Sequence, residues 1–292
     1  MSIRNALLQS TALTALGFAW VVPSVAVAAD LAYPAADPFV NPAFVAPAVS
    51  APNFKFEAFG GWGDAANSGG GGIYGIAGAY SMPIGQQFGL QIDGLVGSWA
   101  GHTFYGTAGH LFWRDPTVGL AGVYGSFKHV DTPGGSNLGQ VAFEGEYYMP
   151  TTTIRGKLGW EGLDLPSRVF GKVDFDWYAT PDLALSVGYR YTGGKSALAL
   201  GAEWLTPHQV GSHRMSVFGE GRIGQDNSSS VLAGLKLYTG PSQTLMEKHR
   251  RDDPEIDKDL YAFANLLNPA SGCPPGETEL YEGEGCGFYD EE

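Results

Sequence analysis

Four charged residues flank a proline turn in the stretch EGEYYMPTTTIRGK. If the chain reverses at Pro150, Glu144 faces Lys157. In the same register Glu146 faces Arg155, and the positions between are small or apolar. Opposite charges directly across two antiparallel strands attract, so the stretch predicts a hairpin with one ionic and one apolar face. Either these pairs neutralise each other in an interior without solvent, or they form a polarised constriction that orients passing solutes.

Histidine and serine chemistry is the other candidate. His102 and His110 are expected on the inward face of one strand, with Asp93 diagonal to His110. Eight residues of strand span more than ~20 Å at about 3.3 Å per residue, so the two histidines cannot share one metal ion. No Ser–His–acid set falls on the outer face near a membrane boundary, where a lipid hydrolase would need it. The sequence therefore predicts no catalytic residues, no metal, no cofactor and no enzymatic activity.

These residues lie in a chain with a pronounced strand pattern. Most of the strand-like segments run 10 to 13 residues with period-two alternation. This exceeds the usual globular strand of about five or six residues and suits a tilted strand that crosses a bilayer. The predicted strands are 54–63, 73–82, 88–99, 102–114, 117–128, 138–149, 152–161, 168–179, 183–192, 195–205, 214–223 and 230–239. The connections alternate between turns that contain proline and turns mostly rich in Gly, Asn and Ser, as expected for strands that run up and down between two environments.

Two faces follow from the alternation. The apolar face comprises Phe56, Trp62, Tyr74, Ile76, Tyr80, Leu90, Ile92, Val96, Leu111, Trp113, Leu120, Tyr147, Leu158, Trp160, Phe175, Trp177, Leu200, Trp204, Val217, Leu235 and Leu237. The other face comprises Lys55, Glu57, Asp93, Glu144, Glu146, Arg155, Lys157, Glu161, Lys172, Asp174, Asp176, Arg190, Glu203, Glu220, Arg222 and Lys236, interleaved with Gly, Ala and Ser. Aromatic residues at strand ends, Tyr238 included, suit interfacial girdles. A soluble β-sandwich would stack its apolar faces on each other, whereas a membrane barrel presents its apolar face to lipid.

The body resembles Gram-negative outer-membrane β-barrels, and SVLAGLKLYTG resembles their last strand, which the barrel-assembly machinery reads. Such proteins often end in an aromatic residue directly after that strand, whereas about fifty residues follow it here. The Pro/Ala-rich N-terminal region loosely resembles that of alphaproteobacterial surface barrels. The resemblance implies an all-β, transmembrane, antiparallel up-and-down barrel of about twelve strands, located in the outer membrane in contact with its lipid.

The chain divides into four parts. We expect a signal peptide over 1–29, an extended Pro/Ala-rich segment over 30–53, the barrel over 54–239 and an acidic tail over 240–292. The extended segment is either a linker or a plug inside the barrel. The tail is expected in the periplasm, with a short helix that begins at Asp253. Cys273 and Cys286 are expected to close a disulfide loop, because a metal site would need more ligands.

The net charge of −13 is concentrated in the tail, which holds 13 acidic against four basic residues from Pro241 onward. No basic cluster suggests nucleic acid. The expected lining of the barrel interior is nearly balanced in charge, so no strong preference for one ion sign follows. We expect these lining and constriction candidates: Glu144, Glu146, Arg155, Lys157, Lys172, Asp174, Asp176 and Arg190.

Three functions remain open from the sequence. The first is a narrow passive channel for small solutes. The second is a non-conducting structural or envelope-tethering protein with a salt-bridged interior, whose tail contacts a periplasmic component. The third is an exported soluble β-protein.

Overall fold

The computed structural model describes residues 46–64, 70–131, 136–164, 166–211, 213–225, 228–256, 278–279 and 286–287. All of these belong to the second of the chain's two compact units, Val45–Glu292. The predicted signal peptide, most of the Pro/Ala-rich segment and Cys273 lie outside the described residues. Within the described residues, no helix is both long enough and apolar enough to cross a membrane.

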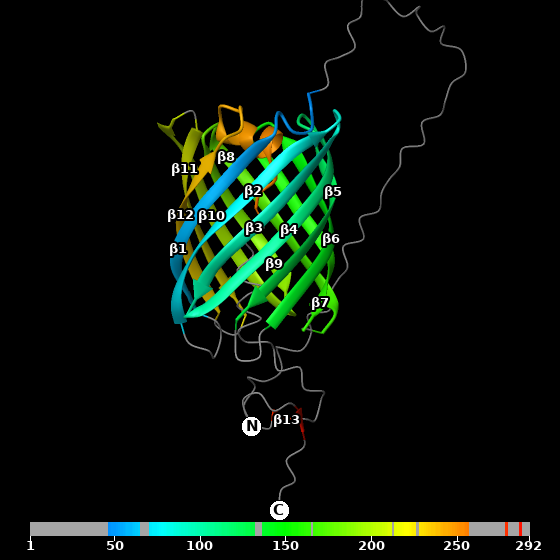
Figure 1. Ribbon diagram of the computed structural model, residues 1–292, viewed down its shortest axis with the longest axis vertical. Coiled ribbons are helices and arrows are strands. Elements are labelled where there is room, and N and C mark those ends of the chain that lie inside the picture. The colour runs from blue at the N-terminus through cyan, green and yellow to red at the C-terminus, as the bar shows by residue number, and fades with distance from the viewer. Residues whose placement is uncertain are drawn as a thin grey trace, which may run out of the picture. The chain divides into compact units, whose positions relative to one another are not determined.

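Twelve antiparallel strands form one closed barrel, in which each strand pairs with its neighbours in sequence and the last strand pairs with the first (Figure 1). The strands are β1 (Asn53–Asp64), β2 (Gly70–Ile84), β3 (Phe88–Trp99), β4 (His102–Asp115), β5 (Gly119–Val130), β6 (Ser136–Met149), β7 (Thr152–Leu163), β8 (Arg168–Thr180), β9 (Leu183–Thr192), β10 (Lys195–Val210), β11 (His213–Gly224) and β12 (Ser229–Tyr238). The predicted fold class and strand number are confirmed. Closure leaves no unpaired sheet edge, so the backbone hydrogen-bonding groups of every strand find partners within the sheet.

A short helical segment follows the barrel. It consists of α1 (Leu245–Glu247) and the π-helical turn η2 (Lys248–Asp252). In Figure 1 this orange segment lies in the barrel mouth, at the same end as the blue start of β1. Two short strands, β13 (Thr278–Glu279) and β14 (Cys286–Gly287), pair with each other further along the chain.

The hairpin register is the one that the charge pattern predicts. Glu144 pairs with Lys157 and Glu146 pairs with Arg155 across β6 and β7. The β9–β10 hairpin turns at Gly193 and Gly194, both with positive φ, a conformation that glycine adopts without steric cost. The side-chain period of two then fixes which residues face inward along each whole strand.

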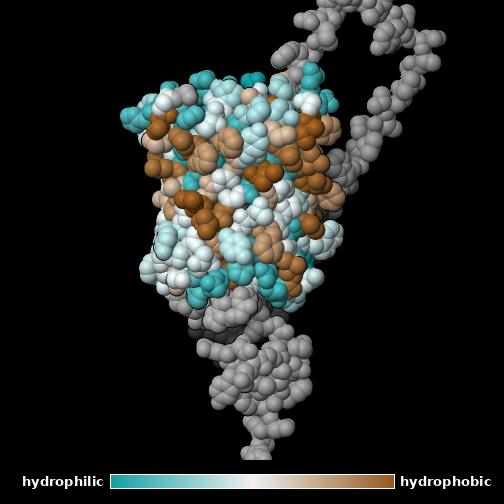
Figure 2. Space-filling model, viewed as in Figure 1, coloured by the Kyte–Doolittle hydropathy of each residue, from teal (hydrophilic) through white to brown (hydrophobic). Residues whose placement is uncertain are grey.

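Large apolar side chains cover the outside of the barrel. Figure 2 shows hydrophobic side chains over much of the visible wall and hydrophilic residues toward its ends. Phe143, Leu158 and Ile223 are each more than 60% exposed. An exposed apolar surface that continues around the barrel is far larger than the patches that soluble monomers tolerate in water.

Two residues of the predicted outer face point inward instead. Leu120 is buried against Val49 and Phe112, because its partners across the sheet, Arg114 and Glu146, face the interior. The sequence prediction began β5 two residues early and mis-assigned the face of Leu120. Tyr238 was predicted in an aromatic girdle but is buried inside, where its hydroxyl donates to Glu203 Oε1 at 2.6 Å.

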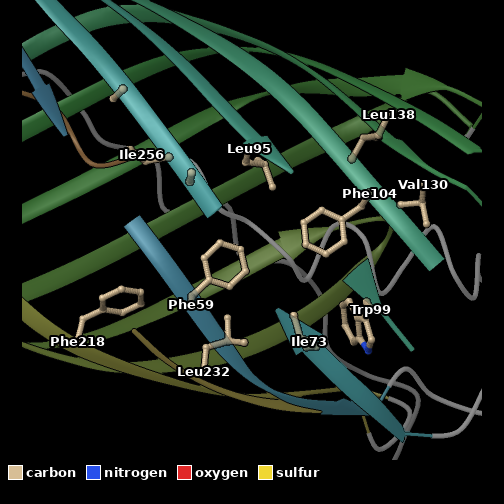
Figure 3. Packing of buried hydrophobic residues seen from close by; sticks show 12 residues of the cluster. Phe59, Ile73, Leu95, Trp99, Phe104, Val130, Leu138, Phe218, Leu232 and Ile256 are labelled. Atoms are coloured by element: carbon tan, nitrogen blue, oxygen red, sulfur yellow. The ribbon is translucent and has the colours of Figure 1, made fainter. Parts of the chain in front are cut away.

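Apolar side chains fill part of the interior. Phe59, Ile73, Leu95, Trp99, Phe104, Val130, Leu138, Phe218, Leu232 and Ile256 form one buried cluster with two alanines (Figure 3). All but one of these residues come from barrel strands. Ile256 comes from the tail, so the chain beyond the barrel enters the lumen.

Close contacts between neighbouring strands make some glycines irreplaceable. A Cβ at Gly61 would lie 1.9 Å from the backbone oxygen of Val231, which cannot move aside as a side chain can. We expect Gly61→Ala to lower the free energy of unfolding by about 1–3 kcal/mol or more. Gly94→Ala is the matched control, because a Cβ there meets nothing within 4 Å. Urea unfolding in lipid vesicles, followed by tryptophan fluorescence, measures both, and equal midpoints would contradict the prediction.

Candidate functional site: the lumen and the tail segment within it

A buried ionic network crosses β3, β4, β6 and β7. Lys157 Nζ lies 3.3 Å from Glu144 Oε2, so this rung of the predicted ladder is an ion pair. His110 stands between two carboxylates, with Nδ1 at 2.9 Å from Glu144 Oε2 and Nε2 at 3.2 Å from Asp93 Oδ2. The ammonium of Lys157 also lies 3.7 Å from the centre of the Tyr124 ring. Each charge in this network is therefore compensated locally, which buried charges require.

The second rung of the ladder is not an ion pair. Although Arg155 is opposite Glu146 in register, its Nε and Nη2 donate to Asp176 of β8 at 2.5 and 2.9 Å. Its Nη1 pairs with Glu255 of the tail. Glu146 instead accepts from the Tyr148 hydroxyl at 2.8 Å. The strand register correctly places Arg155 opposite Glu146, but it does not predict that the guanidinium binds Asp176 and Glu255 instead.

The remaining lining candidates also lie on the inward face. Arg190 Nη2 donates to Asp174 Oδ1 at 2.6 Å. Lys172 is the cross-strand partner of both Lys157 and Arg190. All eight predicted lining residues therefore face the lumen; their role as a constriction is a prediction.

Three more basic side chains lie inside the barrel and were missed from the sequence: Arg114, Lys128 and Lys195. The parity of β4 that places His110 inward places Arg114 inward too, and could have identified it. With these three residues the basic side chains of the barrel wall are no longer outnumbered by the acidic ones. The barrel wall itself therefore lacks the acidic excess of the whole chain.

Arg250 anchors the tail to the barrel mouth. Its Nη2 donates to the carbonyl oxygens of Met149 and Thr152, both at 2.8 Å, and its Nε donates to Thr153 Oγ1 at 3.1 Å. Its guanidinium also lies 5.2 Å from the ring centre of Tyr148. Five donors in a fixed fork suit arginine to this site, where it satisfies two carbonyls of the β6–β7 turn.

Further contacts fix the helical segment. Thr244 and Glu247 form a capping box at the start of α1, and Leu245 is completely buried against Tyr178 and Leu205. The imidazole of His249 lies 3.1 Å from the Tyr178 hydroxyl and 3.6 Å from Glu203. These contacts hold α1 and η2 against β8, β10 and β12.

The tail then enters the lumen. Lys55 Nζ lies 2.6 Å from Asp253 Oδ2 and donates to the Pro254 carbonyl at 2.9 Å. Burial raises the pKa of the Asp253 carboxyl, against the opposing effect of Lys55. Glu255 reaches Arg155, and Ile256 is buried in the apolar cluster. Of the helix predicted to begin at Asp253, the described residues 253–256 form no helical turn, and the rest lies outside the described residues.

The end of the Pro/Ala-rich segment also lies in the mouth. Ala48 and Val49 are completely buried, and Arg114 Nη1 donates to the Ala48 carbonyl at 3.1 Å. The Ser50 amide donates to the Arg251 carbonyl at 2.7 Å, which joins this segment to the tail. Both chain segments that flank the barrel therefore contribute to closing this end.

Small cavities remain among the described residues of the lumen, around the tail. Four small cavities of about 20, 30, 40 and 50 Å³ border Glu255. Cavities of this size hold one or a few water molecules each. In the described part of the chain, no group of three or more His, Cys, Asp or Glu residues is arranged to hold a metal ion. The described structure is thus a barrel with a charged interior, which its own tail enters at one mouth.

Comparison with known proteins adds little to this description. No family model matches the chain, and no curated protein matches it. Among solved structures, the KdgM porin is similar at TM-score 0.45 and 8% identity, over 63% of this chain and 97% of that chain. An outer membrane channel from Pseudomonas putida F1 is similar at TM-score 0.46 and 8% identity, over 68% and 98%. A FadL homologue from Pseudomonas aeruginosa follows at TM-score 0.39 and 9% identity, over 67% and 92%.

These likenesses are too distant to carry an argument. The class is defined by the chain's own geometry: a closed, twelve-stranded, antiparallel barrel with an apolar outer face and a charged lumen.

Proposed function

We propose that the protein is an outer-membrane channel for small solutes, held closed by its own tail. The observation that carries the proposal is the inverted arrangement of the barrel: apolar side chains face outward all around it, while charged residues line the interior. In water the outer face would drive aggregation, whereas in a bilayer it meets hydrocarbon. The ends of the barrel wall are more hydrophilic, as two membrane–water interfaces would require (Figure 2).

Orientation follows from the class. β1 begins and β12 ends at the mouth that α1 and η2 occupy (Figure 1). In outer-membrane barrels with short periplasmic turns, this is the periplasmic side. The tail then closes the channel from the periplasm. We further propose that the assembly machinery reads the last strand, β12, and that the protein is not an enzyme.

The closed lumen supports a channel that opens by release of the tail. Wall residues such as Lys157 and Arg190 have carboxylate partners on the wall itself. Water in an open lumen can solvate Lys55 and Arg155 when their partners in the tail leave. Several contacts of residues 240–256 with the barrel are polar, among them those of Arg250, Pro254 and Glu255. Polar contacts exchange with water at lower cost than apolar packing does.

The second candidate is a non-conducting envelope protein, favoured by the same filled lumen. Two truncations separate the candidates. Deletion of 240–292 removes the anchor and the lumenal segment, whereas deletion of 257–292 keeps both. We expect discrete channel steps in planar bilayers from the first deletion and at least tenfold fewer openings from the second. A folded 240–292 deletion that stays silent would establish the non-conducting role, and a protein soluble without detergent would exclude both.

A further inference from the structure

Three basic residues lie side by side on the inner wall. Lys157 of β7 pairs in register with Lys172 of β8, and Lys172 pairs with Arg190 of β9. Like charges directly opposite each other on neighbouring strands destabilise a sheet. Wall carboxylates lie beside the row: Glu144 is 3.3 Å from Lys157 and Asp174 is 2.6 Å from Arg190. A row of this kind is stabilised by an anion placed against it.

The cavity beside the basic row has an excess of positive charge. Its wall contributes four basic side chains, Arg155, Lys172, Arg190 and Arg222, against two acidic ones, Asp174 and Glu220. Arg190 is buried, and its Nε has no hydrogen-bond partner among the described residues. This cavity therefore presents donors and positive charge to whatever occupies it.

The tail supplies a carboxylate to this cavity. Glu255 borders it, pairs with Arg155 and also borders the adjoining cavity that Lys157 and Lys172 line. Its side chain is about 40% exposed, so it projects into open space rather than into packed wall. Glu255 therefore lies where a ligand of this cavity would lie, and the tail tethers it there.

We propose that the basic row and its cavity form a binding site for small solutes that carry carboxylate groups, and that Glu255 occupies this site in the closed state. A carboxylate solute and Glu255 compete for the same donors, so solute binding favours release of the tail. The inference rests on the proposed channel function and names its solute class. Arginine matches carboxylate geometry in a bidentate manner, and the lysines add charge without fixed geometry.

The tether sets the size of the expected effect. A group on a short flexible segment competes at an effective concentration in the millimolar range. Removal of the competing carboxylate should then raise the apparent affinity for a free carboxylate by about tenfold or more, which corresponds to about 1.4 kcal/mol.

The test uses full-length protein in detergent micelles and calorimetric titration with citrate, with glucose as the neutral control. We expect Glu255→Gln to bind citrate at least tenfold more tightly than the unmodified protein. Glu247→Gln is the matched control, because it removes a tail carboxylate at the mouth while glutamine can still serve the capping box. It should leave citrate affinity unchanged.

Lys172→Gln tests the wall. It removes the central charge of the basic row and relieves like-charge repulsion, so the barrel should fold, which is verified by β-sheet circular dichroism. Combined with Glu255→Gln, it should return citrate affinity to the unmodified level or below. Equal affinity of the Glu255→Gln variant and the unmodified protein, or equal heats for glucose and citrate, would overturn the inference.

Conductance separates this inference from the proposed function. If the 240–292 deletion conducts but Glu255→Gln gains no citrate affinity, the channel stands and the carboxylate site fails. If citrate binds as expected while the deletion stays silent, the site stands in a protein that is not a channel.

Discussion

Arg250→Ala in the full-length protein should open the channel. The change removes two charge-assisted hydrogen bonds, to the carbonyls of Met149 and Thr152, and the contact with Thr153. Bonds of this kind contribute about 1.5–3 kcal/mol each, so the lower bound for two is about 3 kcal/mol. A loss of that size shifts the equilibrium between bound and released tail roughly a hundredfold. Single-channel recording should show an open probability at least tenfold above that of the unmodified protein.

The neighbouring residue provides the control. The side chain of Arg251 is exposed, and the residue's contact with Ser50 runs through its backbone carbonyl. Arg251→Ala removes the same charge from the tail and should leave the open probability unchanged. If the two variants behave alike, net charge of the tail rather than the anchor controls opening.

Glu203→Ala should cause the largest loss of stability in the barrel. The Glu203 carboxylate accepts from Lys236, Ser216 and Tyr238, each at 2.6 Å, inside the wall next to the tail. Removal of one partner of a buried ion pair costs about 3–5 kcal/mol, because the other charge stays buried. Urea unfolding in vesicles should show this loss as a lower midpoint with an unchanged slope.

A double variant tests the cause. Replacement of both charges, with Glu203→Gln and Lys236→Met together, removes the ammonium that Glu203 compensates, although Glu57 loses its 3.6 Å contact with Lys236. The double variant should recover at least half of the loss. Glu220→Gln is the milder comparison, since its carboxylate is more exposed and pairs with Arg222 on the same strand. If Glu203→Ala and Glu220→Gln cost the same, burial of Lys236 is not the cause.

The sequence by itself determined the barrel. Alternation with period two runs through twelve segments, and each strand pairs with the next in the chain, so faces and register follow from local pattern and turn position. The Glu144–Lys157 rung is the clearest case, because both the pairing and the ion contact follow from the proline turn between them. The errors at Leu120 and Tyr238 followed residue type rather than position, since Tyr238 has the parity of Lys236, which the alternation already placed inward.

Only the tertiary structure decided what occupies the lumen. Arg155 turns from Glu146 to Asp176 and to Glu255, a residue 100 positions further along the chain. A long side chain can reach several carboxylates, and its choice depends on which of them the folded chain brings near. The described lumenal contacts of the tail are made by single residues such as Asp253 and Ile256, and no period in the sequence predicts contacts of that kind. The local sequence pattern predicts how a strand pairs with its neighbour. It does not predict that a distant segment enters the space that the strands enclose.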